Sequence, residues 1–418
     1  HRERVLREAR TNAPFVPIVV TENLAWDDFA RLNLDLPYLK GVQTNVGETR
    51  DYPFGAELSH VLGYVSSVSP EDKIDAPRPD DPLLSLPGFR IGKRGVERAF
   101  EGDIRGTGGV SRVEVNAFGR VIRELQRNEG VPGNDLYLTI DRELQSFVHE
   151  RLREESAACT VMDVETGDVL ALVSTPGYDP NGFNVGLSNN EWNSLTQDPY
   201  KPLLNKVLSG TYPPGSTFKI AVALSALENG TITPDTAFSC GGYITVGGRR
   251  FHCWRRGGHG RVNLHLSLKY SCDCYFYEVA RRLGIDALSV GANKLGLGEA
   301  TGIEILGERS GLIPTREWKR ANFNEGWQLG DSVNAGIGQG FITATPMQLC
   351  TMAARLAGGK MVSPRLVHRP GEPRAPVNSL GIADEHLAAV QAGLNGVMNE
   401  PGGTAYRSRI AEPEFAFA

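Results

Sequence analysis

The chain turns sharply at Pro213-Pro214-Gly215 and then enters an apolar, alanine-rich run over residues 218–227. Because two prolines and a glycine cannot continue a helix, whereas Asn229-Gly230 ends one well, the run predicts a helix that begins at this turn. Ser216 is placed at the N-terminal end of that helix, with Lys219 one turn later on the same face. A serine hydroxyl becomes a nucleophile when a base takes its proton, and a lysine held neutral by burial or nearby charge can be that base.

A serine that caps a helix one turn before a lysine is also common in structural helices, so this pair needs a second element. Ser216 is the only serine in the chain that is followed by a lysine at this spacing. Downstream, Ser271-Cys272-Asp273 has the form Ser-x-Asp and begins a second helical run, which ends at Gly284. Residues 188–190, Ser-Asn-Asn, fit Ser-x-Asn but precede the nucleophile, so we discount them.

Further motifs extend through almost the whole chain. They are residues 50–53 with 60–64, 95–100 with 105–106, 115–120, 176–181, and 338–340 with 345–348. With them the chain resembles the class B penicillin-binding proteins, monofunctional D,D-transpeptidases of peptidoglycan synthesis, and most closely the penicillin-binding protein 2 branch that serves cell elongation. The resemblance implies an α+β transpeptidase sheet covered by helices, in agreement with the mixed strand and helix patterns after residue 133.

The resemblance also implies a role for each residue of the two motifs. Neutral Lys219 would take the proton of Ser216 as the hydroxyl attacks the penultimate D-Ala of a D-Ala-D-Ala stem peptide. Ser271 would relay a proton to the leaving amine, and Asp273 would orient Lys219 and the substrate amide. An amine of a second stem peptide would then take the acyl group, and β-lactams would be trapped at the same serine. No cofactor is expected for this chemistry.

One family motif departs from the pattern. The third motif, Lys-Thr-Gly or Lys-Ser-Gly, is expected to follow Gly403-Thr404-Ala405, but the sequence ends at Ala418 without it. Arg309-Ser310-Gly311 has similar chemistry, but it stands too early in the chain and resembles a loop that the family carries elsewhere. We therefore expect part of the oxyanion hole and the carboxylate-binding groups to lie outside these residues.

Four cysteines crowd into residues 240–274 and predict a second kind of site. Cys240, Cys253, His259 and Cys272 have workable spacing for a closed tetrahedral zinc site, on and around a Gly-rich hairpin. The elongation-type relatives that the chain resembles can carry a metal beside the Ser-x-Asp motif. We expect structural zinc, because a disulfide would leave the histidine between the thiols without a purpose.

Alternatives to this metal site remain open. A periplasmic location favours disulfides, and Cys240 could pair with Cys253 across the hairpin. Free thiols are a third possibility, and Cys274 could replace Cys272 as the fourth ligand. The remaining cysteines, Cys159 and Cys350, lie in apolar segments that are typical of buried, inert thiols.

Length and patterning predict two domains. A chain of 418 residues exceeds one ordinary core, and its pattern changes at residues 128–134. The first part resembles the non-catalytic pedestal of the family, so we expect an N-terminal pedestal over residues 1–132 and a transpeptidase domain over 133–418. In the pedestal, residues 17–20 predict a strand and residues 26–34 a helix. In the second domain, residues 159–164 and 169–174 predict a β-hairpin.

Charge and hydropathy limit the partners. A net charge of −5 gives no basic excess for nucleic acid, and no apolar run approaches the length needed to cross a bilayer. From the resemblance we expect a membrane anchor N-terminal to these residues, an inner-membrane location with the catalytic domain in the periplasm, and contacts with a SEDS-type glycosyltransferase and other elongation-complex proteins.

Three other functions compete with the transpeptidase. A serine β-lactamase would share both motifs, but it needs no pedestal and would turn penicillin over rapidly. A non-catalytic β-lactam sensor would be acylated without transferring peptide. A zinc-binding interaction module would explain the cysteines and leave Ser216 and Lys219 unexplained.

Overall fold

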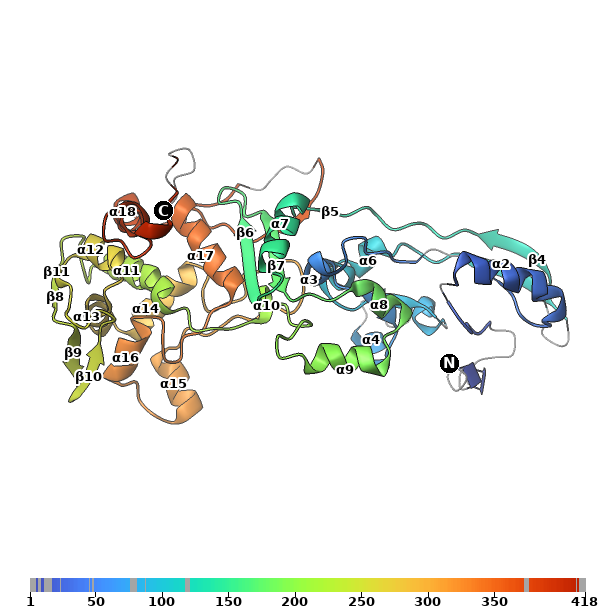
Figure 1. Ribbon diagram of the computed structural model, residues 1–418, viewed down its shortest axis with the longest axis horizontal. Helices are drawn as coiled ribbons and strands as arrows, with labels where there is room; N and C mark the ends of the chain where they lie inside the picture. Colours follow the sequence, from blue (N-terminus) through green and yellow to red (C-terminus); the bar gives the residue numbers. More distant parts are fainter. Residues whose placement is uncertain are drawn as a thin grey trace. The chain divides into compact units, whose positions relative to one another are not determined.

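The structure is a computed structural model that describes residues 5–412 except 7–8, 11–16, 23, 45, 47–48, 76–80, 87, 117–120, 372–375 and 411. Of the family segment 115–120, residues 117–120 therefore lie outside the described residues. The chain divides into two compact units, which are coloured along the sequence in Figure 1. Unit 1 comprises His1–Tyr137, Pro176–Leu203 and Glu304–Leu306, and unit 2 comprises Leu138–Thr175, Leu204–Ile303 and Gly307–Ala418.

Unit 1 is built from short elements joined by loops. The predicted helix at residues 26–34 is present as α2, whereas residues 17–20 form no regular element, so the predicted strand is wrong. The tendency of a short apolar run to form a strand depends on its packing context, which four residues do not determine. The elements are α2 (Trp26–Asp35), η1 (Leu36–Tyr38), η2 (Gly55–Glu57), α3 (Ser59–Leu62), β1 (Val65–Ser67), α4 (Pro70–Asp75), η3 (Pro82–Ser85), β2 (Arg90–Gly92), α5 (Gly95–Ala99), α6 (Glu101–Ile104), β3 (Val110–Val115), β4 (Val121–Asn128), α8 (Pro180–Val185) and α9 (Asn189–Gln197), where η marks a 3-10 helix.

Unit 2 combines helices with antiparallel strand pairs. Its elements are β5 (Tyr137–Leu138), α7 (Arg142–Leu152), β6 (Ala157–Met162), β7 (Val169–Thr175), α10 (Lys206–Ser209), η4 (Gly215–Phe218), α11 (Lys219–Glu228), β8 (Phe238–Cys240), β9 (Tyr243–Val246), β10 (Arg249–His252), β11 (Gly260–Val262), α12 (Leu264–Lys269), α13 (Asp273–Leu283), α14 (Ile285–Lys294), α15 (Arg316–Phe323), α16 (Leu329–Ala335), α17 (Pro346–Gly358), β12 (Val367–His368), α18 (Asp384–Asn399) and η5 (Tyr406–Ser408). Among the described residues, no helix is both long enough and apolar enough to span a membrane. The mixture confirms the predicted α+β class.

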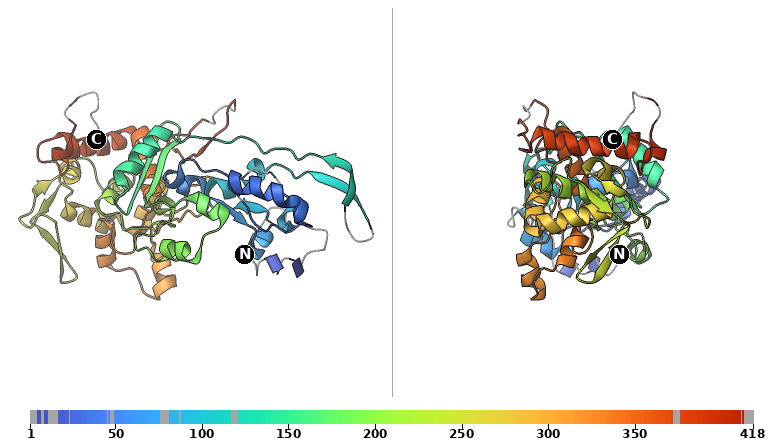
Figure 2. Two further views of the ribbon diagram at one scale, coloured as in Figure 1. Left: turned by 45° about the vertical axis from the view of Figure 1, so that its right-hand side comes forward. Right: turned by 90° about the vertical axis from the view of Figure 1, so that its left-hand side faces the viewer.

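The β6–β7 hairpin confirms the predicted strand pairing. The two strands pair antiparallel from Ala157 with Thr175 to Met162 with Val169. Helix α7 lies along this hairpin in both views, as Figure 1 and Figure 2 show. The amide group of Gln145 on α7 joins them, because its nitrogen donates to the Leu172 carbonyl at 2.9 Å and its oxygen accepts from the Leu172 N–H at 2.8 Å.

The core of unit 2 surrounds α11. Eight of the ten α11 residues, Lys219 and Ala221 to Leu227, are buried, and the helix packs against α12, α13, α14 and α18. A helix that is apolar on all sides belongs in the interior. The exception is its first residue, Lys219, whose side chain is 2% exposed. The fold therefore places a cation at the edge of an apolar core.

The turn before α11 rests on the backbone of Gly338, which belongs to the family segment 338–340. The Gly215 N–H donates to the Gly338 carbonyl at 3.1 Å, and a Cβ on Gly338 would lie 2.3 Å from the Gly215 carbonyl oxygen. Gly338 also has a φ of +68°, which L side chains rarely adopt. Close backbone contact and conformation together require glycine at this position.

We expect Gly338→Ala to lower the free energy of unfolding by about 1–3 kcal/mol more than Gly340→Ala, because forced overlap costs about that amount in packed cores. Gly340 is a matched control, since its φ is +78° but its nearest Cβ neighbour is Asn334 Cβ at 3.3 Å. Thermal unfolding of the two variants measures the difference. Equal melting temperatures would show that the turn tolerates the methyl group.

Candidate active site

The predicted nucleophile lies in a tight turn at the start of the buried helix. Ser216 belongs to the 3-10 helix Gly215–Phe218, one turn earlier than the regular α-helix, which begins at Lys219. The Thr217 hydroxyl donates to the Pro214 carbonyl at 2.8 Å and closes the turn. Ser216 is exposed and Lys219 is buried. The pair therefore presents a solvent-accessible hydroxyl above a buried amine.

Four side chains, Ser216, Ser271, Lys219 and Asp273, form one continuous hydrogen-bonded chain. The Ser271 hydroxyl donates to Ser216 Oγ at 3.0 Å, and Lys219 Nζ donates to Ser271 Oγ at 3.0 Å. Lys219 Nζ also donates to the Ser271 carbonyl at 2.9 Å and to Asp273 Oδ1 at 2.7 Å. These contacts use all three donors of the ammonium group. The structure thus brings together the four residues predicted from the two motifs, although the two serines, Ser216 and Ser271, are 55 residues apart in the sequence.

The connection between base and nucleophile differs from the expectation. Among the described hydrogen bonds, none joins Lys219 Nζ directly to Ser216 Oγ, and Ser271 Oγ stands between them. Ser271 has a φ of +49°, a left-handed conformation that costs a non-glycine residue about 1–3 kcal/mol when it is strained. This conformation lets both its hydroxyl and its carbonyl reach Lys219. Ser271 therefore holds the central position in the series of hydrogen bonds from Lys219 to Ser216.

The second oxygen of Asp273 reaches a residue that sequence reasoning missed. Asp273 Oδ2 accepts from the backbone N–H of Trp254 at 2.8 Å, and the indole nitrogen of Trp254 donates to the Tyr270 carbonyl at 3.0 Å. Trp254 thus contacts Tyr270 before Ser271 and Asp273 after it. Its place next to Cys253 is the only sequence signal for this role, because a backbone donor carries no residue preference.

The predicted metal ligands converge at the N-terminus of α13. Cys240, Cys253, His259 and Cys272 each offer a ligand atom, and these atoms lie within 4.8 Å of one another. His259 Nδ1 is 3.6 Å from the sulfur atoms of both Cys240 and Cys253. Tetrahedral zinc with bonds of about 2.3 Å to sulfur and about 2.0–2.1 Å to nitrogen places such atoms about 3.6 Å apart. The donor set and its spacing fit a zinc ion.

A fifth thiol lies beside this cluster. Hydrogen bonds from Cys272 and then Cys274 hold the pKa of the Cys253 thiol well below its usual value. Cys272 and Cys274 therefore both lie close to Cys253. All six cysteines are free thiols in the structure. The set within 4.8 Å contains Cys272 and not Cys274.

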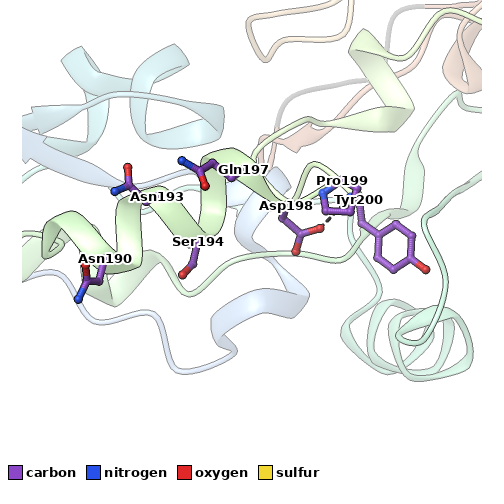
Figure 3. Close-up of a pocket in the computed structure, with 7 residues that line it drawn as sticks. All are labelled: Asn190, Asn193, Ser194, Gln197, Asp198, Pro199 and Tyr200. Atoms are coloured by element: carbon purple, nitrogen blue, oxygen red, sulfur yellow. Dashed lines mark hydrogen bonds between the residues drawn. The ribbon is translucent and has the colours of Figure 1, made fainter.

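The discounted Ser-Asn-Asn segment lies in unit 1 and has a structural role. Ser188 caps α9 through a capping box with Glu191. The same helix lines the surface hollow drawn in Figure 3, together with the loop that follows it, and the Asp198 carboxylate there accepts from the Tyr200 N–H at 2.7 Å. None of the predicted catalytic residues or metal ligands lines this hollow. It gives no support for a second nucleophile.

Comparisons with known proteins identify the family. The penicillin-binding protein transpeptidase domain matches residues 157–416, and the penicillin-binding protein dimerisation domain matches residues 1–138. The chain belongs to the penicillin-binding protein transpeptidase family. It is 39% identical over 419 residues to the peptidoglycan D,D-transpeptidase MrdA of Escherichia coli K12, covering 97% of this chain and 66% of that relative, just under two thirds of its length.

Other relatives and solved structures agree with this family. Penicillin-binding protein 3 of Bacillus subtilis is 30% identical over 398 residues, covering 91% of this chain and 55% of that relative. Penicillin-binding protein 2 in its complex with MreC from Helicobacter pylori has a TM-score of 0.88 and 31% identity, covering 99% of this chain and 77% of that chain. Pseudomonas aeruginosa penicillin-binding protein 2 in complex with WCK 5153 has a TM-score of 0.77 and 33% identity, covering 87% of this chain and 77% of that chain.

We expect Asp273→Asn to lower the free energy of unfolding by about 3–5 kcal/mol, because it leaves the buried Lys219 without its charged partner and because an amide can accept from either Lys219 or Trp254 but not from both. The amide NH₂ would face one of these two donors. Glu278→Gln is a matched control on the same helix, since Glu278 pairs only with the partly exposed Arg281 and Arg282. Thermal unfolding of both variants tests this expectation, and an Asp273→Asn variant as stable as Glu278→Gln would contradict it.

Proposed function

We propose that the chain is the catalytic part of a peptidoglycan D,D-transpeptidase that cross-links stem peptides in cell elongation. The observation that carries the proposal is the chain of hydrogen bonds from Ser216 through Ser271 to Lys219 and Asp273. The E. coli relative carries the name D,D-transpeptidase, and the P. aeruginosa relative was solved in complex with WCK 5153. An exposed serine connected to a buried lysine is suited to forming an acyl-enzyme.

The acylation step follows from the contacts. Ser216 Oγ attacks the carbonyl carbon of the penultimate D-Ala, and its proton passes through the Ser271 hydroxyl to Lys219 in its neutral form. When the tetrahedral intermediate collapses, the C–N bond breaks and Ser271 returns a proton to the leaving D-Ala amine. The amine of a second stem peptide then attacks the ester and regenerates the Ser216 hydroxyl. Asp273 keeps the Lys219 nitrogen in place throughout.

Developing negative charge on the carbonyl oxygen needs hydrogen-bond donors. We assign one donor to the backbone N–H of Ser216, in the turn at the N-terminus of α11. The segment at residues 403–405, after which the third family motif is expected, lies beside the Ser-x-Asp motif, because the Thr404 N–H donates to the Lys269 carbonyl at 3.3 Å. A strand that follows this segment is suited to supply the second donor.

We also propose that Cys240, Cys253, His259 and Cys272 hold a structural zinc ion. The 3.6 Å distances from His259 Nδ1 to two sulfur atoms support this ligand set. Zinc in such a closed site contributes to folding free energy and leaves no open position for substrate. Cys272 and Cys274 flank Asp273, so a cross-link at the thiols would stiffen the segment that positions Lys219.

Partners and location are proposed from the relatives. One solved relative is a complex of penicillin-binding protein 2 with MreC. Another belongs to a peptidoglycan synthase complex that coordinates polymerization and crosslinking. We propose corresponding contacts with elongation-complex proteins and a SEDS-type glycosyltransferase, through a pedestal over residues 1–132 that precedes the transpeptidase domain at 133–418. An N-terminal membrane anchor would hold this domain in the periplasm.

Ser216→Ala is expected to abolish covalent labelling by a penicillin while the fold remains intact, because only the nucleophile is lost. Intact-mass measurement after incubation with penicillin detects the adduct. Lys219→Ala should also slow acylation severely, and the double variant should be no worse than Ser216→Ala, since the residues act as one unit.

Ser188→Ala is the matched control, because it removes a helix-cap serine at a cost of about 1 kcal/mol and should leave labelling unchanged. Labelling of Ser216→Ala equal to that of the unchanged protein would rule out this nucleophile. Rapid turnover of penicillin without a stable adduct would favour a β-lactamase.

Cys253→Ser is expected to remove about one zinc per chain and to lower the melting temperature, because structural zinc contributes directly to folding. Elemental analysis and thermal unfolding measure the two effects, with Cys350→Ser as the control thiol outside the cluster. Thiol counting under denaturing, non-reducing conditions decides between the alternatives. Metal-free protein with two thiols fewer than its six cysteines would mean a disulfide and end the zinc proposal.

A further inference from the structure

Five arginines gather next to the predicted metal ligands. Arg249, Arg250, Arg255, Arg256 and Arg261, here called the arginine surface, fall within 13 residues, and no acidic residue occurs between Asp235 and Asp273. The whole chain has a net charge of −5, so this concentration of positive charge runs against the overall balance. Such a local excess attracts anionic ligands.

The arginine surface is exposed and has no internal counter-charge. All five arginines are exposed, on β10, in the loop after it and at β11, which lie at one edge of unit 2 (Figure 1). Among the described residues, no carboxylate forms an ion pair with any of them. By contrast, Arg281, Arg316 and Arg365 of the same unit each pair with an acidic side chain. The charge of the arginine surface is therefore available to a ligand.

The loop that carries Arg255 and Arg256 is held in place. The Cys253 N–H donates to the Gly242 carbonyl at 2.9 Å, and the Gly258 N–H donates to the Arg255 carbonyl at 2.9 Å. The His259 N–H donates to the Cys240 carbonyl at 3.1 Å. Two of these bonds join the loop to the end of β8 and the turn that follows it, and the bond between Gly258 and Arg255 closes the loop itself. A ligand that binds here does not have to order this backbone, which lowers the entropic cost of binding.

The same loop touches the reaction centre. Trp254, immediately before Arg255, donates from its backbone to Asp273 and from its indole to the Tyr270 carbonyl, so it borders the Ser-x-Asp motif. Its side chain is 59% exposed. Arg255 and Arg256 therefore directly follow Trp254, a residue that contacts the Ser-x-Asp motif. An exposed aromatic ring beside arginines is typical of a binding surface.

We propose that Arg255 and Arg256 bind the carboxylates of the second stem peptide, the one whose amine accepts the acyl group. This inference rests on the proposed transpeptidase function. When the second peptide arrives, the donor peptide already occupies Ser216 as an acyl group, so the second peptide needs a binding surface of its own. The C-terminal D-Ala of this second peptide carries a free carboxylate. The guanidinium group suits a carboxylate better than an ammonium group does, because it donates two parallel hydrogen bonds. The other arginines add a field that draws the anionic peptide toward the loop.

The test uses the chain acylated with penicillin, so that the donor position is blocked. The probes are a fluorescent stem pentapeptide ending in D-Ala-D-Ala and the same peptide with its carboxylates amidated, and anisotropy gives both Kd values. Unchanged protein should bind the free acid about tenfold tighter than the amide, as expected for charge-assisted hydrogen bonds. Arg255→Gln with Arg256→Gln should lose this preference.

The control variant combines Arg281→Gln with Arg282→Gln, whose guanidinium groups already pair with Glu278. It should keep the tenfold preference. Equal binding of acid and amide by the unchanged protein, or a full preference in the Arg255→Gln, Arg256→Gln variant, would overturn the proposal. Binding of inorganic polyphosphate or anionic vesicles without binding of the peptide would also overturn it.

Intact mass is measured on the same penicillin-treated samples. A chain that penicillin does not acylate, but that still prefers the free acid, would contradict the transpeptidase proposal and retain a carboxylate-binding surface. A chain that is acylated at Ser216 without this preference would retain the transpeptidase proposal and lose the surface. The two failures are therefore distinguishable.

Discussion

The Asp273 carboxylate accepts a hydrogen bond on each oxygen from a different part of the chain, and the arrangement of the proposed nucleophile depends on both. One oxygen accepts from Lys219 Nζ at 2.7 Å, and the other accepts from the Trp254 N–H at 2.8 Å. The first contact orients Lys219, the proposed base, toward Ser271, and the second connects the cysteine-rich hairpin to the same carboxylate. A single side chain therefore links the buried helix α11, the Ser-x-Asp motif and the proposed metal cluster.

The burial of Lys219 explains why its contact with Asp273 is required. Lys219 is 2% exposed at the end of an otherwise apolar helix, so its charge has almost no water around it. Removing one partner of a buried ion pair costs about 3–5 kcal/mol, because the remaining charge is uncompensated. The contacts of Lys219 with Asp273 and with both oxygens of Ser271 provide that compensation. The requirement to satisfy a buried amine thus produces the same geometry that proton transfer needs.

The meeting of the four site residues could be predicted from the sequence. Each of the two motifs starts a predicted helix, and the family resemblance indicates that the two motifs belong to one site. The sequence could not predict that Ser271 stands between lysine and nucleophile, since this depends on a positive φ that a serine rarely adopts. The role of Trp254 was equally hidden, because its key donor is a backbone N–H. The strand expected at residues 17–20 is absent because strand formation depends on packing context that local sequence does not reveal.

The strained turn at Ser271 explains why so many contacts gather on its flanks. Its left-handed conformation persists only where the surroundings over-determine it. The Tyr270 carbonyl accepts from the Trp254 indole at 3.0 Å, and the Cys272 N–H donates to the Ser267 carbonyl at 2.8 Å. Cys272 also belongs to the thiol cluster. A metal ion or disulfide at the cluster would therefore fix the residue that directly follows the strained Ser271. The cysteines and the proposed catalytic motif therefore act together on one serine, which they hold in the conformation in which it contacts both Lys219 and Ser216.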